Sequence, residues 1–462
     1  MIQTGSKSYL IRISVVAALG GLLFGYDTAV IAGAIGYLQV KFDLSAAMVG
    51  WAASSAIWGC VVGAMLAGTF SDRFGRKKVL LVTGILFTLS AIGSAIPENL
   101  TQFIGARFIG GLGVGAASML SPLYIAEVAP ARNRGTLVSL YQLAIVLGIN
   151  LVYYINYRIS TSGDEAWNTE FGWRYMLGSE VIPAGLFFFL LLFVPESPRW
   201  MVKNGKAGKA LDTLIKINGV VKAKEILNEI KEVLSHESGK IGELFQPGLR
   251  KALIVGVVLA LFSQITGINA IIYYAPEIFK SVGFATGSAF LQTVIIGVVN
   301  TLFTFVALWL IDQTGRKVLL LWGVGGMILC LLGVGICFQL EITSGPWLLI
   351  FILGYIASFA SSLGPIPWVM MSEIFPTKIR GAAMSFGILI LWIGVLLITQ
   401  LTPMMLEGLG GAITFWIFMV NAMILLLFTW KVIPETKQRT LEEIEQSWKS
   451  GPTEPVIHDH LR

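Results

Sequence analysis

Long apolar segments alternate with short polar ones along nearly the whole chain. The apolar runs are about 20 residues long, the length of a helix that crosses the hydrocarbon core of a bilayer, and they form two groups of six. They lie at about residues 11–35, 47–70, 78–96, 102–124, 134–157 and 175–194, and then at about 251–279, 288–311, 317–339, 347–373, 381–405 and 411–432. This pattern predicts an all-α polytopic membrane protein with twelve transmembrane helices.

The segment between the two groups is a different kind of sequence. Lysine and glutamate alternate there with Leu and Ile at helical spacing, and Ile226, Leu227, Ile230 and Leu234 would share one helix face. Such a face favours packed short helices over a disordered linker. We therefore expect four parts, namely a six-helix half at 1–195, a helical linker domain at 196–250, a second six-helix half at 251–435 and a tail at 436–462.

Composition and charge agree with a membrane protein. Only 13% of the residues are charged, against about 25% in soluble proteins. The basic loops are 73–78, 132–134, 316–317 and 378–380, and they all fall on the same side of the twelve runs. Because basic loops stay in the cytoplasm, we expect a multi-pass plasma (inner) membrane protein with both termini cytoplasmic. The net charge of +6 therefore reports topology, and no nucleic-acid partner is expected.

The cysteines and histidines show no metal-ligand or catalytic pattern. Cys60, Cys330 and Cys337 lie in apolar runs, where a small apolar core role accounts for them. The three histidines lie in polar segments, so none can relay protons inside the membrane. The chain also lacks a Ser-His-Asp set and a phosphate-binding glycine loop. We expect no enzyme activity, no metal, no cofactor and no ATP-driven pumping.

Short polar motifs at the ends of the apolar runs occur twice. DRFGRK at 72–77 returns as DQTGRK at 312–317, EVAPARNRG at 127–135 returns as EIFPTKIRG at 373–381, and PES at 195–197 returns as PET at 434–436. Each motif holds the same place and order in its half. Repetition of this kind indicates two halves related by an axis along the membrane normal, with a substrate site between them at the midplane.

The seventh apolar run, LFSQITGINAIIYYAPEIF at 261–279, places polar side chains at membrane depth. They are Ser263, Gln264, Thr266 and Asn269. Polar groups at that depth are tolerated only where they face protein or a water-filled cavity. Neutral amides suit a neutral polyhydroxyl ligand, because each offers two donors and an acceptor. The alternative is that these amides only join one helix to another.

Several of these motifs resemble those of the sugar porter family of the major facilitator superfamily. The resemblance covers about residues 10–445 and rests on DRFGRK at 72–77, PESPRW at 195–200, QITGIN at 264–269, GPIPW at 364–368 and PETK at 434–437. Within that family the chain is similar to bacterial xylose– and glucose–proton symporters and to mammalian facilitative glucose transporters. The resemblance implies the fold of that superfamily, alternating access, and transport of a monosaccharide across the lipid bilayer by a monomer.

The resemblance also implies where protons bind. Asp27 lies in the middle of the first run, where a carboxylate is a functional hypothesis by default, and Arg107 is its natural partner. The matching Asp accepts the proton in proton-coupled sugar porters, whereas the facilitators carry Asn there. Asp27 therefore implies proton symport. Glu180 matches a second acidic position, which either relays protons or pairs with Arg174.

The remaining site residues are carried over from the family in the same way. The side chains expected to contact the sugar are Phe24, Gln142, Ser263, Gln264, Asn269, Asn300, Trp368 and Trp392. Tyr273 and Tyr274 match an outer gate. The cytoplasmic charge network comprises Asp72, Arg73, Arg76, Glu127, Arg134, Glu196, Arg199, Asp312, Arg316, Glu373, Arg380 and Glu435. It would hold when the cytoplasmic side is closed and break when it opens, or it would act only as a static clamp.

The chain departs from the family pattern around the sugar. The usual Gln-Gln pair is Ser263-Gln264 here, and Leu391, Val395 and Ala360 stand where other members carry polar or acidic groups. Since a net hydrogen bond contributes about 1 kcal/mol, these losses leave the identity of the sugar open. Two alternatives to symport also stay open, a facilitative uniporter and a transporter-like sugar sensor.

Overall fold

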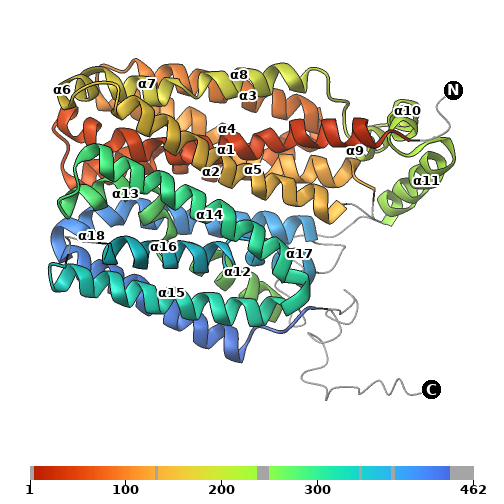
Figure 1. The fold of residues 1–462 in the computed structure, drawn as a ribbon. Helices are drawn as coiled ribbons and strands as arrows, with labels where there is room; N and C mark the ends of the chain where they lie inside the picture. The colour runs from red at the N-terminus through yellow and green to blue at the C-terminus, as the bar shows by residue number, and fades with distance from the viewer. Residues whose placement is uncertain (1–4, 131–133, 237–248, 343–345, 376–379, 438–462) are drawn as a thin grey trace.

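The computed structural model describes residues 5–130, 134–236, 249–342, 346–375 and 380–437, and every regular element in this part of the chain is a helix. Figure 1 shows these helices as two layers, with α1–α8 in one and α12–α18 in the other, while α9–α11 lie beyond one end of the bundle. Ten stretches in the described part are long and apolar enough to cross a membrane. The two groups of apolar runs therefore form two layers of spanning helices.

The first layer follows the predicted runs except at its end. Its helices are α1 (Lys7–Phe42), α2 (Ala46–Phe74), α3 (Arg76–Ala95), α4 (Leu100–Val128), α5 (Arg134–Ser160), α6 (Glu165–Trp167), the π-helical turn η2 (Asn168–Gly172), α7 (Trp173–Gly178) and α8 (Val181–Leu191). The last four elements form one continuous candidate span. It begins ten residues before the expected 175–194, because Asp164 caps its first turn by accepting from the Trp167 N–H.

The second layer contains three interrupted helices. Its elements are α12 (Arg250–Ile265), α13 (Ile268–Ser281), α14 (Thr286–Thr314), α15 (Arg316–Gln339), α16 (Trp347–Ala360), α17 (Ile366–Ile374) and α18 (Arg380–Lys431). Gly267, with φ 97°, separates α12 from α13, and Gly410, with φ 79°, kinks the 52-residue α18. Both glycines take a backbone conformation that is strained for other residues.

Three short helices occupy the segment between the layers. They are α9 (Pro198–Lys203), α10 (Ala207–Asn218) and α11 (Val220–His236). Leu227 is buried in a small core with Trp200 and Leu214, and Ile226 and Ile230 pack against it. The side chain of Leu234, residues 237–248 of the expected linker domain and residues 438–462 of the expected tail lie outside the described part.

Close helix packing inside each layer depends on small residues. A Cβ atom at Gly111 of α4 would meet the Ala56 carbonyl oxygen of α2, and one at Gly25 of α1 would meet the Ile145 carbonyl oxygen of α5. Small residues let helix backbones approach closely where lipid supplies no hydrophobic driving force. These contacts fix α1, which carries Phe24 and Asp27, against α5, which carries Gln142.

The two layers touch along the lengths of α2 and α18, α5 and α14, and α1 and α13. The Ser54 hydroxyl donates to Gln400 Oε1 at 2.9 Å, and the Tyr153 hydroxyl donates to the Ile272 carbonyl oxygen at 2.7 Å. These contacts close the space between the layers on the side away from α9–α11. A cavity remains farther inside.

Candidate functional site

A cavity of about 120 Å³ lies between the two layers, lined by α1 and α5 from one layer and by α12–α14 and α16–α18 from the other. Its walls include all eight expected sugar contacts, which are Phe24, Gln142, Ser263, Gln264, Asn269, Asn300, Trp368 and Trp392. These residues are far apart in sequence, and the fold brings them to one place. The cavity is enclosed by both layers, as a site for a transported molecule must be.

The interrupted helix α12–α13 supplies the central polar group. The Gln264 side chain donates from Nε2 to Ser263 Oγ at 2.9 Å and accepts at Oε1 from Asn269 Nδ2 at 2.7 Å. Ser263 in turn donates to the Ala260 carbonyl oxygen at 2.8 Å. All three side chains are at least 91% buried (relative exposure 1–9%). The break at Gly267 therefore places three neutral polar side chains in one hydrogen-bonded chain that faces the cavity.

Aromatic rings cover the opposite wall. The Phe24 and Trp392 rings lie 5.3 Å apart between centroids and come from different layers. Trp392 is almost fully buried, and its Nε1–H has no protein partner within the described part. A buried indole N–H usually has a hydrogen-bond partner. A hydroxyl of a bound ligand can fill this role, while the ring faces suit the CH face of a sugar.

Two threonines in the cavity wall were not foreseen. Thr28 lies four residues after Phe24 on α1, and Thr304 lies four residues after Asn300 on α14. Residues four apart share a helix face, so this spacing could have identified both. Their hydroxyls donate to the carbonyl oxygens of Phe24 and Asn300 at 2.7 and 2.8 Å, which leaves their oxygen lone pairs as acceptors.

The departures from the family pattern also line this cavity. Leu391, Val395 and Ala360 all contribute to its wall. These side chains offer no hydrogen bond to a ligand, so the wall formed by α16 and α18 is more apolar than the wall formed by α12 and α13.

The two tyrosines of the expected outer gate differ in their surroundings. Tyr273 lines the cavity, whereas the Tyr274 hydroxyl donates to the Thr399 carbonyl oxygen of α18 at 2.8 Å. Both lie on α13, and both are buried. In this arrangement Tyr274 joins α13 to α18, and only Tyr273 can contact a ligand in the cavity.

Asp27, Arg107 and Glu180 form a buried charged cluster in the first layer. Arg107 donates from Nη1 to Asp27 Oδ1 at 2.5 Å and from Nη2 to the Asp27 carbonyl oxygen at 2.8 Å. All three residues are at least 98% buried, and Glu180 lies close enough to interact with both others. Asp27 Oδ2 and Glu180 Oε1 have no partner among the described protein atoms. The cluster thus holds more acceptors than its one cation satisfies.

Arg174 does not pair with Glu180. Its guanidinium donates to the carbonyl oxygens of Ala95 and Pro97, both at 3.0 Å, and stacks over the Trp173 ring at 4.4 Å. The nearest basic group for Glu180 in the cluster is therefore Arg107, which Asp27 also contacts.

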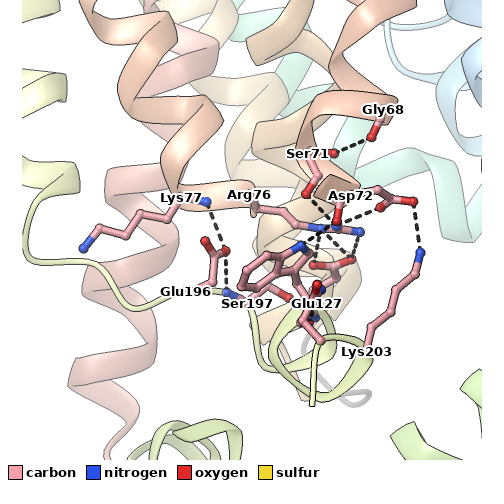
Figure 2. Close-up of polar contacts among 11 residues, drawn as sticks. Gly68, Ser71, Asp72, Arg76, Lys77, Glu127, Glu196, Ser197 and Lys203 are labelled. Carbon is pink, nitrogen blue, oxygen red and sulfur yellow. Dashed lines mark hydrogen bonds and ion pairs between the residues drawn. The ribbon is translucent and has the colours of Figure 1, made fainter. Parts of the chain in front are cut away.

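The charged motif of the first layer forms a compact network, shown in Figure 2. Arg76 binds Glu127 through Nε and Nη2, at 3.0–3.2 Å, and Asp72 through Nη1 at 2.9 Å. Lys203 of α9 reaches Asp72 at 3.0 Å. Glu196 accepts from the Lys77 backbone N–H at 3.1 Å, at the start of α3. Helices α2, α3, α4 and α9 are tied together there.

The second layer repeats this arrangement. Arg316 binds Glu373 at 2.9 Å, and Glu435 accepts from the backbone N–H groups of Arg316 and Lys317 at 2.9 and 3.0 Å. Gly315, with φ 100°, turns the chain there as Gly75, with φ 102°, does in the first layer. These pairs each join elements of one layer, so the network appears as two clusters.

The other expected members of the network lie around these clusters. The Arg73 guanidinium lies over the Phe74 ring at 5.3 Å, Arg134 is exposed at the start of α5, and Arg199 lies on α9. The side chains of Asp312 and Arg380 lie outside the described part. Among the described residues, no group of three or more His, Cys, Asp or Glu side chains could hold a metal ion.

Comparison with known proteins places this site in a family. Residues 13–448 match the profile of the family described as "Sugar (and other) transporter". The chain is similar to the arabinose-proton symporter of Bacillus subtilis (48% identity) and to the D-xylose-proton symporter of Escherichia coli K12 (42% identity), with 96% of both chains covered in each case.

Solved structures agree. The partially occluded inward-open form of the xylose transporter XylE from E. coli superposes with a TM-score of 0.85 at 41% identity and covers 94% of this chain and 100% of that one. The XylE symporter bound to 6-bromo-6-deoxy-D-glucose superposes with a TM-score of 0.82 at 42% identity and covers 96% and 99%.

Proposed function

The chain belongs to the sugar (and other) transporter family, and on that premise we propose that it is a secondary transporter that imports a monosaccharide together with a proton. The observation that carries this proposal is the cavity between the two layers, where eight polar and aromatic side chains converge. The similar proteins named above are transporters and not enzymes. Alternating access would expose this cavity first to one side of the membrane and then to the other.

The sugar we propose is a pentose. The two similar symporters named above carry arabinose and D-xylose according to their names. In this chain Leu391, Val395 and Ala360 remove hydrogen-bonding groups from the cavity wall. A pentose has one carbon and one hydroxyl-bearing group fewer than a hexose, so it leaves fewer hydroxyls unpaired against that apolar wall.

Proton coupling would depend on the buried cluster. Asp27 is the proposed proton acceptor, because Arg107 binds its ionised form and the second oxygen of the carboxylate has no protein partner within the described part. Glu180 is the proposed second carboxyl that shares Arg107. When one of them is protonated, the other can keep the arginine, so the cluster can change its charge without leaving a buried cation unpaired.

The proposed topology has twelve spanning helices in two six-helix halves. Counting α12–α13 as one span, α16–α17 as one, and α18 as two on either side of Gly410 gives six per layer. Both halves carry their charged clusters at the same end, next to α9–α11, and basic loops mark that end as cytoplasmic. The two clusters would stabilise the closed cytoplasmic side, and the chain would act as a monomer in the plasma membrane.

Replacing Gln264 by alanine should weaken sugar binding. Gln264 bridges Ser263 and Asn269, so its loss removes a ligand contact and also frees Asn269. We expect a loss of about 1–3 kcal/mol, or roughly five- to 150-fold in affinity. Uptake kinetics in proteoliposomes measure it, with Gln400→Ala as the control, since Gln400 bonds Ser54 outside the cavity. Unchanged KM and binding in Gln264→Ala would place the sugar elsewhere.

Restoring the usual polar groups should change the sugar preference. The double variant Ser263→Gln, Leu391→Gln adds two amides to the cavity wall, so a hexose gains partners for its additional hydroxyl. We expect the ratio of kcat/KM for glucose over xylose to rise by about tenfold, since each net hydrogen bond contributes about 1 kcal/mol. Competition uptake with a panel of pentoses and hexoses measures this ratio. An unaltered profile would show that these positions do not set specificity.

A further inference from the structure

The break between α12 and α13 controls the relative placement of two cavity amides. Gln264 lies in the last turn of α12, and Asn269 lies in the first turn of α13, on the other side of Gly267. Their side chains are hydrogen-bonded to each other at 2.7 Å. A helix that ends leaves its last carbonyl groups without an intrahelical partner. Whatever binds those carbonyls therefore holds the end of α12 in place.

Two side chains from distant helices bind these carbonyls. The Asn421 side chain of α18 donates from Nδ2 to the Ile265 carbonyl oxygen at 3.0 Å, and the Tyr355 hydroxyl of α16 donates to the Thr266 carbonyl oxygen at 3.1 Å. Tyr355 is completely buried and Asn421 is partly buried. Neither of them lines the cavity. They act on the backbone behind the amides and not on a bound molecule.

The same part of α18 also packs directly on the break. A Cβ atom at Gly267 would meet the ring of Phe418, which lies one helical turn before Asn421. Gly267 has φ 97°, so only glycine fits both the backbone conformation and the space. The break is therefore held on one side by a ring in close contact and on the other by two directed hydrogen bonds.

We propose that Asn421 and Tyr355 are positioning residues for the sugar site, which they serve by holding the carbonyl end of α12 and so fixing Gln264 against Asn269. This inference rests on the proposed function, since it assumes that the two amides bind the sugar. Loss of either anchor leaves a buried carbonyl unpaired and loosens the break. The amides then no longer present one fixed set of donors and acceptors.

The test uses Tyr355→Phe and Asn421→Leu in the full-length transporter. Each removes one anchor with little change in side-chain volume. We expect the Kd for D-xylose or L-arabinose, measured by titration of the purified protein, to rise about three- to tenfold in each variant. KM for uptake should rise in parallel, while kcat and the dependence of accumulation on the proton gradient are retained.

Tyr124→Phe is a matched control. The Tyr124 hydroxyl donates to the Pro195 carbonyl oxygen at 2.8 Å and is equally buried, but it lies beside the charged network of the first layer. It removes the same kind of bond away from the cavity. We expect a similar decrease of Tm in Tyr124→Phe and Tyr355→Phe, with a raised Kd only in Tyr355→Phe. An equal rise of Kd in both variants, or unchanged Kd in both anchor variants, overturns the proposal.

Amide hydrogen exchange of residues 262–272 without sugar separates this proposal from the proposed function. We expect faster exchange in both anchor variants than in the wild type, and no change there in Tyr124→Phe. Unaltered exchange at the break contradicts the anchoring role even where a sugar binds. If the wild type binds none of the sugars, the proposed function fails, while the exchange data still decide whether Asn421 and Tyr355 hold the break.

Discussion

Asp27→Asn should abolish accumulation of the sugar against its gradient while leaving exchange of sugar across the membrane. An amide cannot take up and release the proton, so import can no longer be driven by the proton gradient. The Arg107 bond to the Asp27 carbonyl oxygen does not depend on the side chain, and Glu180 remains near the arginine. The cation therefore keeps partners, and the protein should still fold and move between its conformations.

Two assays on the same vesicles separate these outcomes. Gradient-driven uptake should fall to the level of simple equilibration, while counterflow of labelled sugar should persist within a few-fold. Asp43→Asn is the control, because Asp43 caps the same helix α1 but is exposed, and both activities should be unchanged there. Accumulation that survives in Asp27→Asn would remove Asp27 from proton coupling.

Arg76→Leu should destabilise the folded protein more than Arg316→Leu, although both arginines occupy the same place in a repeated motif. The Arg76 and Glu127 side chains are 9% and 5% exposed, whereas Arg316 and Glu373 are 12% and 22% exposed. Removing one partner of a buried pair leaves the other charge unpaired, which destabilises by about 3–5 kcal/mol. Water reaches Glu373 more easily, so the second substitution should have a smaller effect.

Thermal unfolding in detergent, followed by intrinsic fluorescence, measures the difference. Lys203→Leu serves as the comparison at the surface, since the Lys203–Asp72 pair is about half exposed on both sides and such pairs contribute about 0–1 kcal/mol. The expected order of the decrease in Tm is Arg76→Leu, then Arg316→Leu, then Lys203→Leu. A larger decrease for Arg316→Leu than for Arg76→Leu would show that burial does not rank the two clusters.

The spanning helices could be predicted because their signal is local. An apolar run of bilayer length reports a helix wherever it occurs, and the repeated motifs mark equivalent helix ends. The sixth run was placed too late, since Glu165, Asn168 and Glu170 make the start of its helix look like a loop. Only the cap by Asp164 and the packing of Trp173 and Asn168 in the interior show that the helix begins there.

The members of the candidate site could be named from motifs, but the bonds that hold them could not. Asn421 is 156 residues from Ile265, and Tyr355 is 89 residues from Thr266. A side chain that donates to a distant backbone carbonyl leaves no pattern in the sequence. Ser263 was expected to touch the sugar, yet in the structure it also receives the Gln264 amide. Such pairings depend on how the helices pack, and they appear only when the fold is known.

Uptake of radiolabelled L-arabinose and D-xylose into proteoliposomes, with and without an inward proton gradient, tests the central claim most directly. Sugar–proton symport predicts that one of these pentoses accumulates above its outside concentration when the gradient is imposed, and only equilibrates when a protonophore removes it. Equilibration that is indifferent to the gradient would contradict symport and show a facilitative uniporter. Binding of a sugar without any uptake would contradict transport altogether.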